Sequence, residues 1–210
     1  MQRINQKGFT LFEIAFAVVI ITLLATIMVM GQNFTVNSQV NRLEHDFRSI
    51  QTAIYDTQDV LRSKHGDVRK VSLHLQDSAV SGNNGNLNGI IEGNWSSTSG
   101  ANFKLWQNVY PSGLAQGLTD TKLNAHIPLK LAGGVIGVSE VHDAVIAGLN
   151  GNYTICTNNI AGQYVKKLDL VMDDGNTATG SMRVSNSVGG TAIATDSIVN
   201  SSTYMVCLGV

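Results

Sequence analysis

A single acidic side chain within an apolar segment is the feature of this sequence that points most directly to chemistry. Glu13 lies near the start of an otherwise apolar run that continues to Met30. A carboxylate in membrane hydrocarbon costs several kcal/mol, about 3 on insertion scales, so it needs a partner or a purpose. Cleavage after Gly8 would supply the partner, because the new α-amino group of Phe9 would be a cation one helical turn from Glu13.

The residues around this bond resemble a known processing signal. They are Lys7-Gly8, Phe9-Thr10-Leu11 and Glu13, followed by about 20 apolar residues. The arrangement resembles the class III signal of type IV pilins and of the pseudopilins of type II secretion. The resemblance covers about the first 25 residues. It implies that a prepilin peptidase cuts after Gly8 and methylates Phe9, and that Glu13 guides the subunit into a helical filament.

The apolar run also has two simpler interpretations. An ordinary secretory signal would be cleaved after its apolar core at small residues, and Ala25-Thr26-Ile27-Met28 is a poor match to such a site. A plain membrane anchor would explain the run and the basic Arg3 and Lys7 on its cytoplasmic side. It leaves Glu13 without a role, so the processing signal is the favoured interpretation.

The sequence predicts a long N-terminal helix followed by a globular head. Apolar residues recur at helical spacing after the membrane segment, and they are Val36, Val40, Leu43, Phe47, Ile50, Ile54 and Leu61. No proline interrupts residues 9–61, and Gly31 is the weakest helical position. The expected parts are a leader (1–8), a transmembrane or filament-core helix (9–31), an amphipathic helix half (32–66) that ends near Gly66, and a head (67–210). The fold class is α+β, with the helix packed on an antiparallel sheet as in pilins.

Within the head, the C-terminal third has the clearest patterns. A short helix is expected from Ile160 to Met172, with Asn158 or Asn159 as its N-cap. Strands are expected at residues 181–185, 191–195 and 203–208. Further upstream, Trp106 is expected to anchor the core.

Charge and cysteine usage are those of an exported domain. The formal net charge is −1, and removal of Arg3 and Lys7 with the leader makes it about −3, so nucleic acid is not expected as the main partner. The only cysteines are Cys156 and Cys207. Their even number and the predicted export favour a disulfide between them, worth on the order of 4 kcal/mol, over two separate buried thiols.

Two other polar clusters have features of cation-binding sites. Asn84, Asn86 and Asn88 have the spacing of a calcium loop, but all three are amides and Trp95 replaces the expected final glutamate. A second acidic turn contains Asp169, Asp173, Asp174 and Asn176. Both segments fit plain turns better than metal sites, so no metal and no cofactor is predicted. The basic residues at 62–70 fit a helix C-terminus better than a DNA site, and the five dispersed histidines show no metal-ligand spacing.

The favoured function is that of a structural subunit, not of an enzyme. The expectation is a major or minor subunit of a type IV pilus, with a type II secretion pseudopilin as the first alternative and a DNA- or surface-binding minor pilin as the second. The expected partners are prepilin peptidase, other pilin copies, the inner-membrane assembly platform and membrane lipid. The precursor would span the bacterial inner membrane with a cytoplasmic leader and a periplasmic head. After assembly it would lie in an extracellular pilus or a periplasmic pseudopilus.

Overall fold

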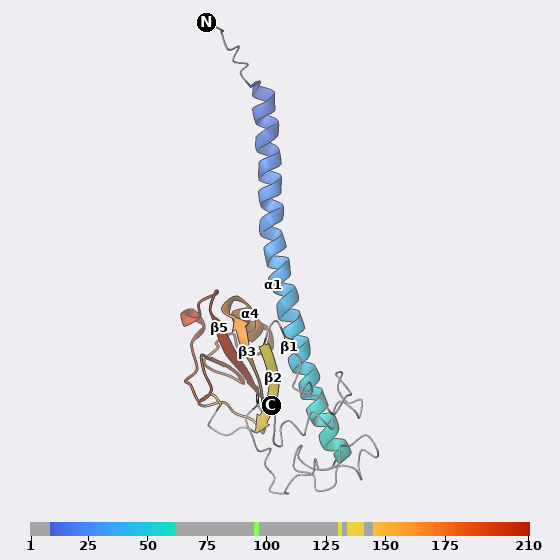
Figure 1. Cartoon of the computed structure of the whole chain (residues 1–210), viewed down its shortest axis with the longest axis vertical. Coiled ribbons are helices and arrows are strands. Elements are labelled where there is room, and N and C mark those ends of the chain that lie inside the picture. The colour runs from blue at the N-terminus through green and yellow to red at the C-terminus, as the bar shows by residue number, and fades with distance from the viewer. Residues whose placement is uncertain (1–8, 62–94, 97–129, 132–133, 141–144) are drawn as a thin grey trace. The chain divides into compact units, whose positions relative to one another are not determined.

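A computed structural model describes residues 9–61, 95–96, 130–131, 134–140 and 145–210 of the chain (Figure 1). The chain divides into two units, Met1–Ser38 and Gln39–Val210, and each is described by itself. The first helix, α1, runs from Leu11 to Leu61 and has 51 residues. It contributes residues to both units.

In the first unit, α1 is a regular helix, and its side chains from residue 11 to residue 28 are exposed. Its only polar side chains between Ile14 and Met28 belong to threonines. The Thr22 hydroxyl donates to the carbonyl of Val19 at 2.8 Å, and the Thr26 hydroxyl donates to the carbonyl of Thr22 at 2.6 Å. Hydroxyls that bond within their own helix do not need water. These threonines therefore suit an apolar environment.

Gly31 does not interrupt the helix, although propensity makes it the weakest position. The residue is helical, its carbonyl accepts a hydrogen bond from the Thr35 hydroxyl at 3.0 Å, and a Cβ there would meet no atom within 4 Å. Packing therefore does not require a glycine at this position.

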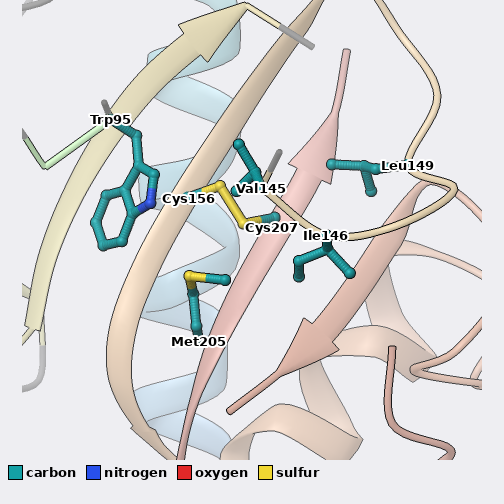
Figure 2. Packing of buried hydrophobic residues seen from close by; sticks show 7 residues of the cluster. All are labelled: Trp95, Val145, Ile146, Leu149, Cys156, Met205 and Cys207. Carbon is teal, nitrogen blue, oxygen red and sulfur yellow. A yellow bond between two sulfur atoms is a disulfide. The ribbon is translucent and has the colours of Figure 1, made fainter. Parts of the chain in front are cut away.

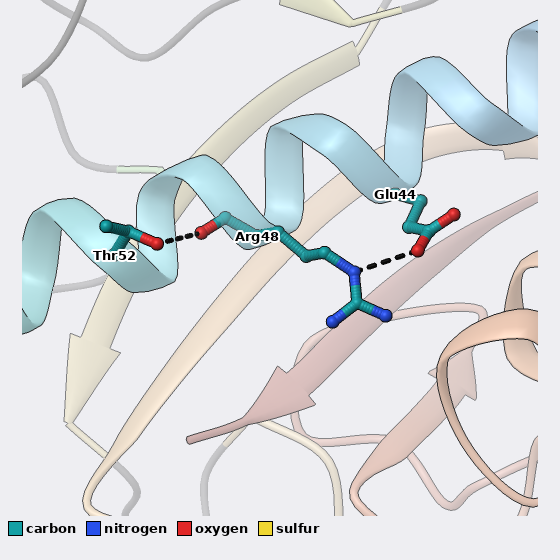
Figure 3. A network of polar contacts seen from close by, with 3 residues as sticks. All are labelled: Glu44, Arg48 and Thr52. Atoms are coloured by element: carbon teal, nitrogen blue, oxygen red, sulfur yellow. Dashed lines mark hydrogen bonds and ion pairs between the residues drawn. The ribbon is translucent and has the colours of Figure 1, made fainter.

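In the second unit, α1 presents one buried stripe and one polar face. The stripe repeats at intervals of three and four residues, as expected for an amphipathic helix, and consists of Val40, Leu43, Phe47, Ile50, Ala53 and Ile54. On the polar face, the Arg48 guanidinium donates to the Glu44 carboxylate at 2.8 Å, and Thr52 donates to the carbonyl of Arg48 (Figure 3). Such an exposed pair adds about 0.3–0.5 kcal/mol, so the buried stripe dominates.

The sheet of the head is antiparallel throughout, with strand order β1-β2-β3-β5-β4. Its strands are β1 (Lys130–Leu131), β2 (Gly134–Glu140), β3 (Tyr153–Ala161), β4 (Met182–Ser185) and β5 (Thr203–Gly209), and helix α4 (Gly162–Met172) and the 3-10 helix η3 (Thr195–Ser197) lie between strands. The predicted α+β class is confirmed. Strands were predicted correctly at 181–185 and 203–208.

Both faces of the central strands are buried. On the face that includes Tyr153, the Tyr153 hydroxyl accepts a hydrogen bond from Gln58 of α1. Side chains alternate between the two faces along each strand. The same face therefore also carries five buried residues, which are Ile136, Val138, Ile155, Val206 and Leu208. The opposite face carries a cluster of Trp95, Val145, Ile146, Leu149, Cys156, Met205 and Cys207 (Figure 2). Because two layers cover the sheet, its strands lack a simple apolar-polar alternation.

Gly137 of β2 lets the main chain of Trp95 approach this second face. A Cβ on Gly137 would lie 1.8 Å from the Trp95 carbonyl oxygen, a distance that no real side chain can adopt. The Trp95 side chain is buried in the cluster, so this residue is a core anchor that the sequence analysis did not identify.

Two predictions about local structure were wrong. Asn158 and Asn159 do not cap a helix, because β3 continues to Ala161 and α4 begins only at Gly162. The two asparagines lie where the pairing of β3 with β5 shifts register, and Asn159 has a φ of 60°. Asparagine tolerates this left-handed conformation better than most residues, which suits it to a β-bulge.

The predicted strand at 191–195 is also not present. Ile193 donates one backbone hydrogen bond to Val184, but the segment forms no ladder and leads into η3. Thr195 instead donates its hydroxyl proton to the carbonyl of Gly175 at 3.0 Å and accepts a hydrogen bond from the amide of Thr177. Such side-chain to backbone bonds compete with strand pairing.

Several predictions lie outside the described residues. They are the end of the first helix near Gly66, the basic cluster at 62–70, the asparagine loop at 84–88 and the core role of Trp106.

Candidate functional site

The N-terminal turn of α1 is built around Thr10 and Glu13. The Glu13 Oε2 atom accepts hydrogen bonds from the Thr10 amide at 3.0 Å and from the Thr10 hydroxyl at 2.9 Å. In return, the Glu13 amide donates to the Thr10 hydroxyl oxygen at 3.3 Å. This reciprocal arrangement is a capping box, which satisfies backbone donors that have no partner at the start of a helix.

The capping box gives Glu13 a role that the sequence analysis missed. A threonine followed three residues later by a glutamate, just before an apolar run, is the sequence signal for this motif, and Thr10 and Glu13 match it. A plain membrane anchor therefore does not leave Glu13 without a role, contrary to the sequence-based expectation. In the structure, the carboxylate already has a local function before any cleavage.

The predicted processing residues have different places in the structure. Gly8 lies outside the described residues. Phe9 directly precedes the capping box and is highly exposed. Glu13 is also exposed, so a partner from another chain could reach it.

An apolar surface follows directly after the capping box. Within the described residues, Leu11–Met28 is one stretch of helix that is long and apolar enough to cross a membrane, and none of it is buried. Its 18 residues would span about 27 Å, close to the thickness of a bilayer core. The large exposed side chains include Leu11, Phe12, Ile14, Phe16, Val18, Val19, Ile20, Ile21, Leu23, Leu24, Ile27 and Met28. A surface of this kind needs lipid or another apolar partner.

In the head, Cys156 of β3 and Cys207 of β5 form a disulfide. The two residues are directly opposite each other in the antiparallel ladder, and both are fully buried. The bond closes a segment that contains α4, β4 and η3. The expected cross-link is therefore present between the two central strands.

The remaining polar predictions concern the histidines and the acidic turn at 169–176. Of the five histidines, His45 is described, and its Nδ1 atom lies 3.8 Å from the Asp46 carboxylate on α1. Partial burial raises the pKa of Asp46, while His45 and Arg42 act against that rise.

The acidic residues Asp169, Asp173 and Asp174 lie close together at the end of α4. Asn176 donates its amide hydrogen to Asp174 in the predicted turn.

Comparisons with known proteins address the N-terminal segment. A family model described as the prokaryotic N-terminal methylation motif matches residues 3–29. This motif is the signature of type IV pilins and pseudopilins. No curated protein and no solved structure matches the chain. The motif and the exposed apolar helix fit a membrane-anchored precursor that is a pilin-like or pseudopilin subunit.

Proposed function

We propose that this pilin-like subunit is cut between Gly8 and Phe9, methylated on Phe9 and assembled into a type IV pilus. The observation that carries the proposal is the position of Glu13, an exposed carboxylate in the first turn of a wholly exposed apolar helix. Prepilin peptidase would process the chain. The other partners of this chain would be further pilin copies, the assembly platform in the inner membrane and membrane lipid.

Assembly follows from the same surface. Burial of apolar area between neighbouring helices is favourable by about 25 cal/mol per Å². Between identical apolar helices, that term sets no particular register. A charge pair does, because an unpaired carboxylate in a dry filament core costs several kcal/mol. The Phe9 amine created by cleavage can supply the cation, within one subunit or from a neighbour.

The cleavage site is tested by Gly8→Ser in cells that contain the processing machinery. We expect the variant to remain as an uncut precursor in the membrane. The wild-type chain should lose residues 1–8 and gain one methyl group on Phe9, as measured by mass spectrometry of the N-terminal peptide. Efficient cleavage of Gly8→Ser would contradict the assignment.

The role of Glu13 is tested with two variants that separate charge from helix capping. Glu13→Gln keeps a side-chain acceptor suited to the capping box but removes the charge. Thr10→Ala keeps the charge but removes the capping hydroxyl, at a cost of about 1 kcal/mol in helix stability. We expect both variants to be cleaved, and we expect filament yield to fall strongly in Glu13→Gln alone.

The opposite result would assign Glu13 to helix capping. If Glu13→Gln formed normal filaments and Thr10→Ala did not, charge pairing would be ruled out. Glu13→Ala and Glu13→Val remove both roles and should block assembly without blocking cleavage, so normal filaments from either variant would contradict any role of Glu13 in assembly.

A type II secretion pseudopilin is the alternative to a pilus subunit, because the N-terminal motif is the signature of both. Electron microscopy of filaments sheared from the cell surface separates them. Loss of surface filaments on deletion of the chain supports a major pilus subunit, and altered filament number or length supports a minor one. Unchanged filaments combined with a secretion defect would support the pseudopilin.

A further inference from the structure

Three carboxylates converge at the C-terminal end of α4. Asp169, Asp173 and Asp174 each place one oxygen within 4.8 Å of the oxygens of the other two. The carbonyl end of a helix carries partial negative charge, which disfavours acidic side chains there. Three like charges at this end also repel one another. The arrangement is therefore unfavourable unless something offsets the charge.

Asp169 is the least expected member of the cluster. It follows Leu168 on the inner side of α4, and its exposed fraction is 0%. Neither of its carboxylate oxygens has a hydrogen-bond partner of normal geometry among the residues that the structure describes, and the Gly175 amide only partly offsets its charge. One of its carboxylate oxygens lies within the cluster, so this buried acid points toward the other two acids.

The other two carboxylates are held in place by the turn that follows α4. The Asp173 Oδ2 atom accepts a hydrogen bond from the Met182 amide at 2.8 Å. A Cβ on Gly180 would lie 2.0 Å from the same oxygen, and Gly180 has a φ of +69°. A glycine is therefore needed here to let the Asp173 carboxylate reach its position.

Asp174 is fixed by two local donors. The Asn176 amide donates to Oδ1 at 2.8 Å, and the Thr179 hydroxyl donates to Oδ2 at 2.6 Å. These hydrogen bonds orient the Asp174 carboxylate, so the turn holds it beside the buried Asp169.

We propose that Asp169, Asp173 and Asp174 bind a hard divalent cation, with Ca²⁺ the preferred ion. Two ligands that each lie about 2.4 Å from one Ca²⁺ can be at most about 4.8 Å apart, and the three oxygens meet this limit. Oxygen-only ligands and an irregular arrangement suit Ca²⁺, whereas Zn²⁺ prefers nitrogen and sulfur in a tetrahedral site. Water and backbone carbonyls would complete the coordination.

The ion would have a structural effect on the head. It would offset the repulsion at the end of α4 and give the buried Asp169 carboxylate a partner. Because Asp173 also bonds to the first residue of β4, the ion would tie α4 to β4 through one short turn. Binding to the folded state alone stabilises that state.

The test uses the full chain in detergent, freed of metal with EDTA and dialysed. Calorimetric titration with CaCl₂ measures binding, and thermal melting with and without about 10 mM CaCl₂ measures stabilisation. The main variant is Asp169→Asn, which keeps the shape of the side chain and removes its charge. The matched control is Asp56→Asn, which removes one exposed charge from α1.

We expect CaCl₂ to raise the Tm of the wild-type chain by roughly 5 °C. Asp169→Asn should lose this response, and its Tm in EDTA should exceed that of the wild type because the buried charge is gone. Asp56→Asn should respond like the wild type. The proposal is overturned if the wild type neither binds Ca²⁺ nor gains stability, or if Asp169→Asn binds with unchanged affinity.

A second variant keeps the test decisive if Asp169→Asn does not fold. Asp174 is exposed, so Asp174→Asn should fold and should weaken Ca²⁺ binding by about tenfold or more, as expected when ligand charge is reduced. Unchanged affinity in this variant would overturn the proposal. None of these measurements requires a filament, so they are independent of the test of assembly.

Discussion

The two parts of α1 show how one helix can serve two environments. In residues 11–28 the apolar side chains surround the helix and all are exposed. From Val40 to Ile54 they form one stripe, which is buried in the head. Backbone conformation is the same in both parts, so the difference lies in the arrangement of apolar residues around the axis. The first part depends on lipid or other subunits for burial, and the second depends on its own chain.

The largest expected effect contrasts two phenylalanines on this helix. Phe47 is 0% exposed and Phe16 is 60% exposed. Phe47→Ala should lower the free energy of unfolding of the head by about 3–5 kcal/mol, because it leaves a cavity. Phe16→Ala should change it by no more than about 0.5 kcal/mol. Thermal melting of the full chain in detergent measures both, and equal losses would remove the distinction between the two parts.

The disulfide should give the next largest effect, and only in the head. Replacing both cysteines, Cys156→Ala with Cys207→Ala, should cost about 2–4 kcal/mol, since the unfolded chain regains the freedom that the closed loop removed. Denaturant unfolding of the two proteins, with and without reductant, checks this value. Reductant should have no effect on the double variant, and an undiminished stability of that variant would contradict the prediction.

A pH effect is expected at Asp169 when metal is absent. Burial is the main cause that raises the pKa of Asp169 to about 7, and the charges of Asp173 and Asp174 add to it. The Gly175 amide opposes the rise. The nearby Arg183 acts on the pKa of Asp174. The folded state then binds more protons than the unfolded state between about pH 4 and pH 7. Stability in EDTA should therefore fall as pH rises through this range, by on the order of 4 kcal/mol, and level off above it.

Melting of the full chain from pH 5 to pH 8 measures this dependence. Asp169→Asn should flatten the curve, because the substituted amide does not titrate. A wild-type curve that is flat over the same range would show that Asp169 is already charged at pH 5 in the folded state, and would contradict the prediction.

The smallest effect is expected at Gly31, and Gly137 provides the contrast. Gly31 has open space where a Cβ would be, whereas a Cβ on Gly137 would overlap the Trp95 carbonyl. Gly31→Ala should stabilise the helix locally by about 1 kcal/mol, equivalent to roughly fivefold slower amide exchange at residues 31–35. Gly137→Ala should instead destabilise the head. Faster amide exchange in Gly31→Ala would contradict the prediction, because it would show that Gly31 stabilises the folded helix.

Local patterns were sufficient to predict α1, α4 and two strands of the head. The stripe from Val40 to Ile54 has a helical period, and the lack of proline allows one continuous helix. Predictions failed where side chains bonded to distant backbone. The Thr195 side chain forms hydrogen bonds with the backbone of Gly175 and Thr177. These bonds are present in place of the strand pairing that the local pattern predicts. The bulge at Asn159 depends on the pairing of β3 with β5, which no local pattern specifies.

The candidate sites divide in the same way. The signal for the capping box was present in the sequence as Thr10 and Glu13, but it was not recognised. In the sequence, Trp95 is notable only because it occupies the position of a glutamate in a calcium loop. Its place in the core depends on its packing against Gly137 and the disulfide, which only the fold brings together.

The sequence by itself determined the N-terminal part of this protein. A processing motif, a capping box and an apolar run are continuous segments, and their chemistry depends on neighbours along one helix. Only the tertiary structure decided the state of Asp169. The sequence indicated a plain acidic turn, whereas packing of α4 on the sheet buries this carboxylate beside Asp173 and Asp174. Burial is a property of the whole fold, and it turns an ordinary acid into a group that requires a partner.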